Sequence, residues 1–349
     1  AGFGHFAGYS GLRIGGGCRG CGAETEIEMT ARIIATARIF PATRALLERA
    51  GPVVHPTGDE PWDNAALRGA LAEAEAMMAF MTDRVDAELL KAAPKLRVLA
   101  CALKGADNID IAACEARGIA VSIVPDLLTS PTAELAIGLA IGLARHIRAG
   151  DAAVRADFKG WRPKFYGLGL DGAKVTILGL GRLGRAIAMR LMPFGCQLRG
   201  VDPVNDVPSV ERMPLEQALH GADLVSAALP LTAETRNLVD ASAIACLPKG
   251  ALLVNIGRGS TVDEMAVAEA LQTGLLGGYA ADVFAMEDWA LPDRPRAIPR
   301  ALLDHPRSLF TPHLGSATLA ARQAIEAEAA FNILVGLGVS VRELSSATA

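Results

Sequence analysis

KVTILGLGRLGRAIAMRL, residues 174–191, contains the strongest structural signal in the chain. Its apolar run 175–178 predicts a strand, and 182–191 has the spacing of an amphipathic helix. The turn between them has the pattern G-x-G-x-x-G, whose glycines allow a tight bend and let a pyrophosphate approach the helix N-terminus. A dinucleotide site is therefore predicted here. The expected cofactor contacts are Gly179, Gly181, Arg182, Leu183 and Gly184.

The next predicted strand, QLRGV, ends at Asp202, 18 residues after Gly184. A carboxylate at about this distance from the glycine turn accepts hydrogen bonds from the ribose hydroxyls and repels a 2′-phosphate. We therefore expect NAD rather than NADP. The alternative is an ordinary turn aspartate in front of Pro203.

Short apolar runs alternate with helical segments on both sides of this motif, which predicts parallel sheets covered by helices. The runs are ARIIATARI, AEAMMAFM, LRVLACAL and IAVSIVP before it, and DLVSAALP, ALLVNIGRG, GYAADVF and SLFTPHLG after it. The predicted fold class is α/β, with two Rossmann-like, doubly wound parallel-sheet domains and a cleft between them. One would be a flavodoxin-like substrate domain and the other an NAD-binding Rossmann domain.

We expect residues 129–312 to form the NAD-binding domain, and residues 29–128 with 313–349 to form the substrate domain. A long helix over about 132–148 would join the two. A second helix, over 317–336, would return to pack on the substrate domain. The glycine-rich residues 1–28 lack a hydrophobic period, so we expect a disordered or non-native extension there.

Composition narrows the classes of ligand. The chain has 349 residues, 51% of them hydrophobic, and a formal charge of −4, so no basic field attracts nucleic acid or an acidic membrane. No apolar stretch approaches the length of about 20 residues needed to span a bilayer. Six scattered cysteines without a secretory signal indicate free thiols in the cytoplasm. Cys18 and Cys21 lack further ligands at metal spacing, so no metal site is expected.

Three charged residues follow predicted strands of the second half: Arg258, Glu287 and His313. Taken singly they have ordinary interpretations, as a capping arginine, a solvated glutamate and a core histidine. Together at successive strand ends they supply a base, an acid that can orient it and a fixed cation. Hydride removal from an anionic donor requires these groups.

The blocks ILGLGRLGRAIA, LVNIGRGSTVDE, GGYAADVF and FTPHLGSA resemble the signature segments of the D-2-hydroxy-acid dehydrogenases, and the similarity extends from Met29 to about Asn332. The resemblance implies an NAD-dependent oxidoreductase in which Arg258 holds the substrate anion, Glu287 hydrogen-bonds His313, and His313 is the acid/base. It also implies a homodimer. By the same resemblance Pro230 and Asp282 contact the cofactor and Ser316 contacts the substrate.

The segments CALKGADN, KGWRPKFYG and MEDWALPDRP resemble the phosphite (phosphonate) dehydrogenases within that family. This implies oxidation of phosphite to phosphate, with Lys104 and Arg258 binding the dianion and Gly105 offering its backbone N–H. Met81 would line the pocket, and Trp161 and Tyr166 would reach it from an arm at the dimer interface. Point charges suit a compact tetrahedral dianion.

Ile256, Gly257 and Ala285 depart from the phosphite dehydrogenase pattern, which has proline, cysteine and an acid there. Two other functions remain open. One is a conventional D-2-hydroxy-acid dehydrogenase, or glyoxylate and hydroxypyruvate reductase. The other is a non-enzymatic, NAD-sensing protein like the corepressors of this fold.

Overall fold

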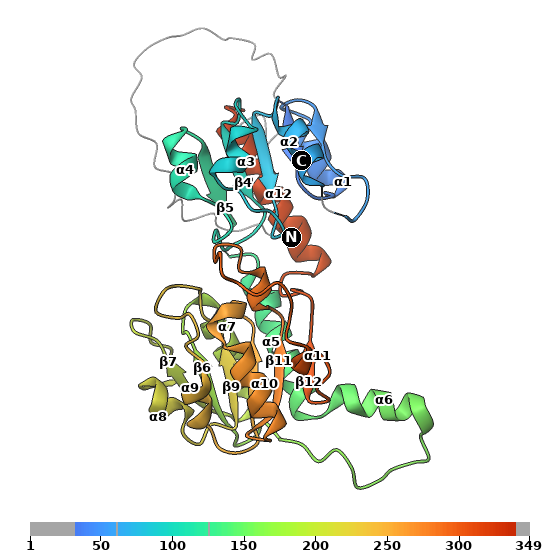
Figure 1. The fold of residues 1–349 in the computed structure, drawn as a ribbon, viewed down its shortest axis with the longest axis vertical. Helices are drawn as coiled ribbons and strands as arrows, with labels where there is room; N and C mark the ends of the chain where they lie inside the picture. The colour runs from blue at the N-terminus through green and yellow to red at the C-terminus, as the bar shows by residue number, and fades with distance from the viewer. Residues whose placement is uncertain (1–31, 61, 125, 340–349) are drawn as a thin grey trace, which may run out of the picture.

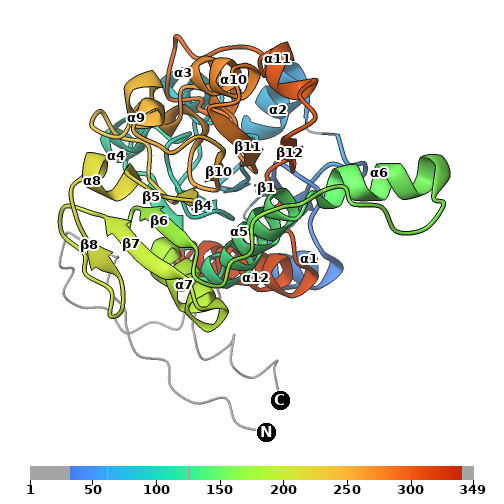
Figure 2. The ribbon, with the colours of Figure 1, turned by 90° about the horizontal axis from the view of Figure 1, so that it is seen from below.

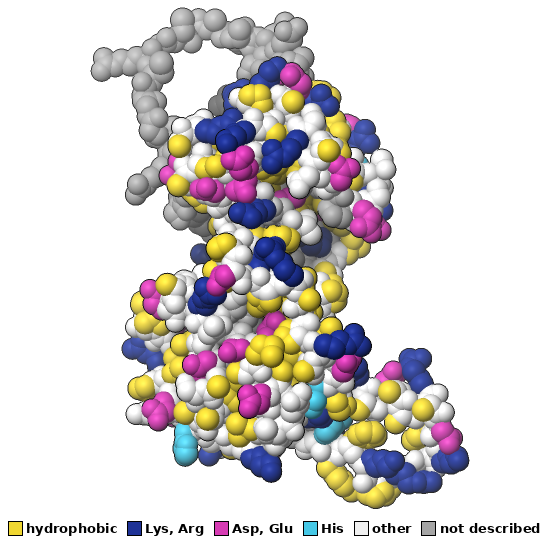
Figure 3. Space-filling model, viewed as in Figure 1, with side chains coloured by type: hydrophobic (Ala, Val, Ile, Leu, Met, Phe, Trp, Pro, Cys, Tyr) yellow, Lys and Arg dark blue, Asp and Glu magenta, His cyan; other side chains and the backbone are white. Residues whose placement is uncertain are grey.

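The computed structural model describes residues 32–60, 62–124 and 126–339, which form two α/β domains placed one above the other in Figure 1. Every strand pair in both sheets is parallel, which confirms the predicted fold class. The molecule narrows between the two lobes (Figure 3). The extension expected over 1–28, with Cys18 and Cys21, and the tail 340–349 lie outside the described residues.

The first domain is built on a five-stranded sheet with the order β2-β1-β3-β4-β5. The side chains of its inner strands are apolar without alternation, because helices cover both faces of the sheet. The strands are β1 (Ile33–Ala35), β2 (Val53–Val54), β3 (Ala76–Ala79), β4 (Val98–Cys101) and β5 (Ala120–Ile123). The helices between them are α1 (Pro41–Leu47), α2 (Asn64–Leu71), α3 (Ala87–Lys91) and α4 (Ile111–Ala116).

The helix predicted over 317–336 is α12 (Leu319–Gly336), and Thr318 caps it by accepting from the Ala321 N–H. It packs against α1, β3 and β4 of the first domain. Its apolar face, including Ile325 and Ile333, is fully buried with the side chains of β1 and β3. The end of the described chain therefore completes the domain in which it began.

The second domain is built on a seven-stranded sheet with the order β12-β11-β10-β9-β6-β7-β8. The chain order reverses between β6 and β9, and in such sheets ligands bind beyond the carboxyl ends at this point. The strands are β6 (Lys174–Leu178), β7 (Gln197–Val201), β8 (Glu211–Arg212), β9 (Leu224–Ala227), β10 (Ala251–Asn255), β11 (Leu276–Ala281) and β12 (Ser308–Phe310). The helical segments are α7 (Arg182–Leu191), η1 (Met192–Phe194), α8 (Leu215–Leu219), α9 (Ala241–Ala245), η2 (Gly259–Thr261), α10 (Glu264–Gln272), η3 (Ala285–Glu287) and α11 (Arg300–Leu303).

The long helix predicted over about 132–148 is present as α5 (Thr129–Ala144), but it ends before the predicted position, and a second helix, α6 (Ile147–Asp157), follows. His146 between them has a φ of 54°, in the left-handed region that ends a helix. The last α5 carbonyl, of Ala144, accepts from the Leu168 N–H of the returning chain. Helix α5 packs on α7, β10 and β11, whereas α6 projects from the body and buries none of its residues (Figures 1 and 2).

Among the described helices, none combines the length and apolar character required to cross a membrane. The four cysteines inside the described ranges are free thiols. They are Cys101, Cys114, Cys196 and Cys246.

Candidate active site

The glycine turn lies at the carboxyl end of β6, next to the point where the chain order reverses. Gly179 has a φ of 88°, which side chains other than glycine rarely adopt. A Cβ on Gly184 would lie 1.8 Å from the Gly179 carbonyl oxygen, so the turn is closed by direct backbone contact. Gly181 precedes the first residue of α7. A pyrophosphate bound at this turn would therefore lie at the N-terminus of α7, where backbone N–H groups can donate to it.

Asp202 directly follows β7 and is tied to this turn. Its Oδ2 accepts from the Leu180 N–H at 2.8 Å, and its Oδ1 accepts from the backbone N–H groups of Val204 and Asn205 at 2.9 and 2.7 Å. Burial acts to raise the Asp202 pKa, but these hydrogen bonds outweigh it and lower the pKa. The carboxylate is therefore charged, which fits an NAD ribose and disfavours a 2′-phosphate.

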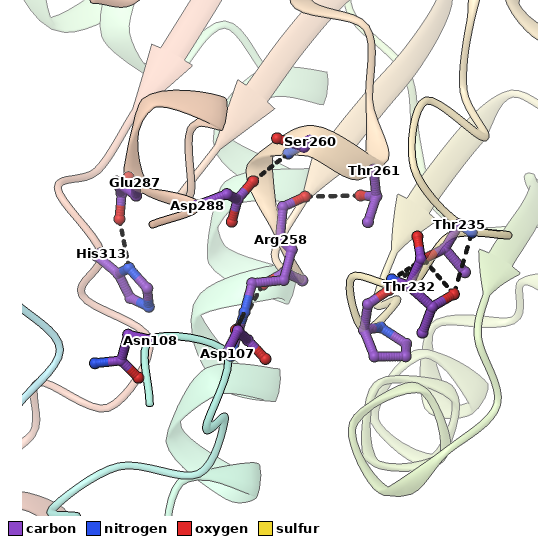
Figure 4. Close-up of polar contacts among 12 residues, drawn as sticks. Asp107, Asn108, Thr232, Thr235, Arg258, Ser260, Thr261, Glu287, Asp288 and His313 are labelled. Atoms are coloured by element: carbon purple, nitrogen blue, oxygen red, sulfur yellow. Dashed lines mark hydrogen bonds and ion pairs between the residues drawn. The ribbon is translucent and has the colours of Figure 1, made fainter. Parts of the chain in front are cut away.

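The remaining cofactor residues expected near this turn differ in their surroundings. Arg182 forms an ion pair with Asp126, which precedes α5, and Leu183 is half-buried against the core under α7. The Pro230 carbonyl accepts from the Thr235 hydroxyl at 2.6 Å, so it caps the turn beyond β9 that Figure 4 shows at Thr232 and Thr235. The expected contacts of these three residues with the cofactor stay predictions.

His313 and Glu287 are joined directly, as the sequence predicted. The His313 Nδ1 lies 2.6 Å from Glu287 Oε2, and Glu287 Oε1 accepts from the Phe284 N–H at 3.0 Å (Figure 4). His313 itself has a φ of 56°, a strained conformation for a residue with a Cβ. This conformation turns the imidazole out of the strand direction, toward the first domain.

Asp282 supports the turn that carries His313. The carboxylate is 1% exposed. Its Oδ1 accepts from the Thr311 hydroxyl and the Leu314 N–H, and its Oδ2 from the Gly315 N–H. Burial raises the Asp282 pKa against the effect of these bonds. The expected contact between Asp282 and the cofactor stays a prediction, whereas its hold on the His313 turn is direct.

Arg258 follows β10 and reaches across to the first domain. Its Nε lies 2.5 Å from Asp107 Oδ2, and its Nη1 donates to the Gly257 carbonyl at 3.0 Å. A Cβ on Gly105 would lie 1.8 Å from Arg258 Nη2, so the guanidinium packs directly on that glycine. In Figure 4 the side chains of Arg258 and His313 both point toward Asp107 and Asn108.

Lys104 lies in the same turn of the first domain as Gly105. Its Nζ donates to the Thr129 hydroxyl at 3.5 Å, and its side chain is partly buried. Burial lowers the Lys104 pKa, and repulsion from Arg182 and Arg258 lowers it further against the attraction of Asp126. The ammonium therefore shares the electrostatic environment of Arg258.

The structure does not bring every predicted substrate residue to this place. Trp161 and Tyr166 are each 77% exposed on the segment after α6, remote from the domain junction within one chain. Met81 is half-buried against the first-domain core, beyond β3. Ser316 is half-buried and follows the turn that Asp282 holds.

The three departures from the phosphite dehydrogenase pattern occupy tight positions. Ile256 is 3% exposed and Ala285 is 8% exposed. A Cβ on Gly257 would lie 2.5 Å from the Leu229 carbonyl oxygen. These residues therefore belong to the packing beneath Arg258 and Glu287.

Two charged contacts of the site were missed by sequence reasoning. Asp107, the partner of Arg258, belongs to the segment CALKGADN but was not predicted to be a site residue. Arg322 on α12 places its guanidinium 5.6 Å from the Phe80 ring centroid and donates to the Ala102 carbonyl at 3.4 Å, just before Lys104. Arg322 reaches the Ala102 carbonyl only because α12 packs on the first domain, and no local sequence pattern predicts this contact.

Comparisons with known proteins agree with this geometry. Residues 137–315 match the family model described as D-isomer specific 2-hydroxyacid dehydrogenase, NAD binding domain. A glyoxylate reductase of Thermofilum pendens is 34% identical over 85% of this chain and 88% of its own length. A glyoxylate reductase of Pyrococcus horikoshii is 36% identical over 75% of this chain and 79% of its own. A crystal structure of a Thermus thermophilus protein superposes with a TM-score of 0.80 at 32% identity, over 88% of this chain and 96% of that one.

Proposed function

The chain belongs to the D-isomer specific 2-hydroxyacid dehydrogenase family, and we propose that it interconverts a small 2-oxo acid and its 2-hydroxy acid, with glyoxylate and hydroxypyruvate as the substrate class. The chain is thus an NAD-dependent oxidoreductase with the NAD-binding domain of that family. The observation that carries the proposal is the contact of His313 with Glu287, at the junction where Arg258 meets Asp107. The glyoxylate reductases among its relatives support the substrate class.

The roles of the chain's own residues follow from their contacts. Bound NAD would supply or accept a hydride at its nicotinamide ring. Arg258 binds the substrate carboxylate, because its planar fork matches two oxygens. The His313 nitrogen that does not face Glu287, Nε2, donates a proton to the oxo group in reduction and takes it from the hydroxyl in oxidation. Glu287 holds the ring in one orientation through its contact with Nδ1.

Phosphite oxidation is a second candidate, favoured by one observation. Lys104 directly precedes Gly105, on which the Arg258 guanidinium packs, and its ammonium adds a positive charge to this turn that a monocarboxylate does not require. In this reaction phosphite, NAD⁺ and water give phosphate, NADH and a proton. A P–O bond forms from water, the P–H bond breaks with its electron pair leaving as hydride, and His313 takes the water proton. Lys104 and Arg258 would hold the dianion.

We propose a homodimer formed through α6 and the segment that follows it. This arm buries none of its α6 residues and exposes several apolar side chains, each at least 43% accessible. They are Ile147, Val154, Phe158, Trp161, Phe165 and Tyr166. A second copy of the chain, presenting the same arm, is the partner that such an apolar surface fits.

Steady-state assays of the purified full chain test the proposed function. NADH would be supplied with glyoxylate or hydroxypyruvate, and NAD with phosphite, while nicotinamide absorbance is followed. We expect turnover of the 2-oxo acids and a loss of roughly a thousandfold in His313→Gln. His220→Gln, an exposed histidine on another surface, should leave turnover unchanged.

The variant Lys104→Ala separates the two candidates. Loss of phosphite turnover with 2-oxo acid reduction retained would assign Lys104 to the dianion, and the exposed Lys95→Ala serves as its control. NAD binding without turnover of any of the three substrates would contradict both candidates. That result would favour the NAD-sensing alternative.

A further inference from the structure

The turns that carry Arg258 and Glu287 touch each other through their backbones. A Cβ on Gly259 would lie 1.9 Å from the Phe284 carbonyl carbon and 2.1 Å from the Ala285 nitrogen. No side chain fits there, so η2 packs its first residue on the peptide with which η3 begins. The position of the anion-binding cation relative to the acid/base pair therefore depends on this contact.

Asp288 fastens the first of the two turns. It is 6% exposed, and its Oδ2 accepts from the Ser260 N–H at 2.7 Å (Figure 4). Burial raises the Asp288 pKa, opposed by its hydrogen bonds with Ser260 and by the charge of Arg258. Asp288 follows Glu287 and Ser260 lies two residues after Arg258, so this hydrogen bond connects the two turns.

Glu264 fastens the second turn from beneath. It is the first residue of α10 and is 5% exposed, and its Oε1 accepts from the Ala285 N–H at 2.8 Å. Its Oε2 is buried and has no hydrogen-bond partner within residues 32–60, 62–124 and 126–339. Burying a carboxyl oxygen without a hydrogen bond costs free energy, so the presence of Glu264 here calls for an explanation. The bond from its other oxygen to the Ala285 N–H supplies one.

We propose that Glu264 and Asp288 are positioning residues, which clip the Arg258 turn to the Glu287 turn and so set the separation between the anion-binding cation and the His313 base. The inference rests on the proposed function for the roles of Arg258 and His313. Neither carboxyl binds the reacting groups in this account. Each acts through the backbone N–H that it accepts.

The two clips should affect different kinetic constants. Asp288 holds the Ser260 N–H, so its loss frees the turn of Arg258 and weakens anion binding. Glu264 holds the Ala285 N–H at the start of η3, so its loss frees Glu287 and impairs proton transfer at His313. Substitutions should therefore separate KM from kcat.

The surroundings of Glu264 add a dependence on pH. Burial is the main cause that raises the Glu264 pKa, to about 7, and the acidic groups Asp288, Glu287 and Asp263 act in the same direction. The buried Tyr279 on β11 also faces it. Because the Glu264 pKa lies near neutral pH, the charge on the carboxyl that accepts from the Ala285 N–H changes in this range.

Two matched pairs of variants test the KM and kcat separation. Asp288→Ala should raise KM for the anionic substrate about tenfold with kcat little changed, and Asp288→Asn, which can still accept from Ser260, should restore it. Glu264→Met keeps the volume but removes the acceptor, and should lower kcat about tenfold with KM little changed. Glu264→Gln should restore kcat.

The control is Asp263→Asn, at the N-cap of the same helix. Among the described residues its carboxylate accepts from the Met265 and Ala266 N–H groups of α10, and the asparagine amide oxygen can replace it there, so the variant should leave both KM and kcat little changed. Equal effects of Glu264→Met and Asp263→Asn on kcat would overturn the positioning role. So would a failure of the conservative variants to rescue.

A readout besides activity keeps the inference separable from the proposed function. The His313 imidazole signals can be observed by NMR and are assigned as those missing in His313→Gln. Loss of the Glu264 acceptor in Glu264→Met should change their chemical shifts, because the turn that carries Glu287 is no longer held at the Ala285 N–H, and Asp263→Asn should not. Unchanged His313 chemical shifts in Glu264→Met would overturn the positioning role even in a protein with no turnover of the substrates tested.

Discussion

Arg258 is oriented by three contacts, and one of them comes from the other domain. The Asp107 carboxylate accepts from its Nε and the Gly257 carbonyl accepts from its Nη1. The guanidinium packs on Gly105, where a side chain would clash with it. The bonds to Asp107 and Gly257 use two of the five guanidinium N–H donors, and the others remain to bind an anion. The Arg258 side chain is 21% exposed, so its attraction for an anion is less screened than that of a surface arginine.

Asp107→Asn should therefore weaken substrate binding more than it slows the chemical step. The amide keeps the shape but loses the charge-assisted bond to Arg258 Nε, which is worth roughly 1 to 3 kcal/mol. We expect KM for the anionic substrate to rise about tenfold, measured by steady-state kinetics. Asp110→Asn, which changes the N-cap of α4, is the control. A KM equal to the wild-type value would show that Asp107 does not orient Arg258.

The start of helix α10 should make the stability of the protein depend on pH. The Glu264 pKa is about 7 in the folded chain and 4.5 for the group in water, so the folded state binds this proton more tightly. The contribution of Glu264 to the free energy of unfolding is complete below pH 4.5 and is lost as pH rises through about 7. The loss amounts to at most about 3 kcal/mol.

Melting temperatures of the wild type and Glu264→Gln, compared at pH about 5 and about 8, measure this contribution. The wild type should lose stability on going to the higher pH relative to the variant, which cannot ionise. A parallel pH dependence in the two proteins would show that Glu264 does not retain its proton in the fold.

Helix α6 is the element whose surface lacks a partner in a single chain. Val154 is 56% exposed, and an aspartate there should cost the isolated chain little but should disrupt an apolar interface between copies. We expect Val154→Asp to halve the mass measured by light scattering. Ala152→Asp lies on the opposite side of the helix and is the control. A monomeric wild type would contradict the proposed dimer.

The overall architecture was predictable because local patterns determine it. The β6 strand, the glycine turn and α7 follow from the order of apolar residues and glycines, and the ends of β7, β10 and β12 place Asp202, Arg258 and His313 on one edge. Their placement at this edge could be expected from the parallel topology alone.

What escaped prediction depends on contacts between distant segments. His146 breaks the long helix because the chain returns at Leu168 to bond the end of α5. Asp107 meets Arg258 only when the two domains come together, and Glu264 reaches the Ala285 peptide only through the packing of α10 under η3. No spacing in the sequence encodes these three contacts.

At the scale of the whole molecule, both domains contribute residues to the candidate active site. Arg258 pairs with Asp107, and Arg182 pairs with Asp126, so two ion pairs connect the glycine turn and the catalytic turn to the first domain. Lys104 lies in the same turn of the first domain as Gly105, on which the Arg258 guanidinium packs. A substrate anion bound at Arg258 is thus in reach of groups from both lobes.

The transfer of deuterium from labelled cofactor tests the central claim most directly. NADH carrying deuterium in both C4 positions of the nicotinamide would be incubated with glyoxylate and the purified chain, and the product would be examined by NMR. We predict glycolate with one deuterium at C2, and about a thousandfold less of it from His313→Gln. Bound NADH that yields no labelled glycolate, or glycolate formed without the label, would contradict hydride transfer at this site.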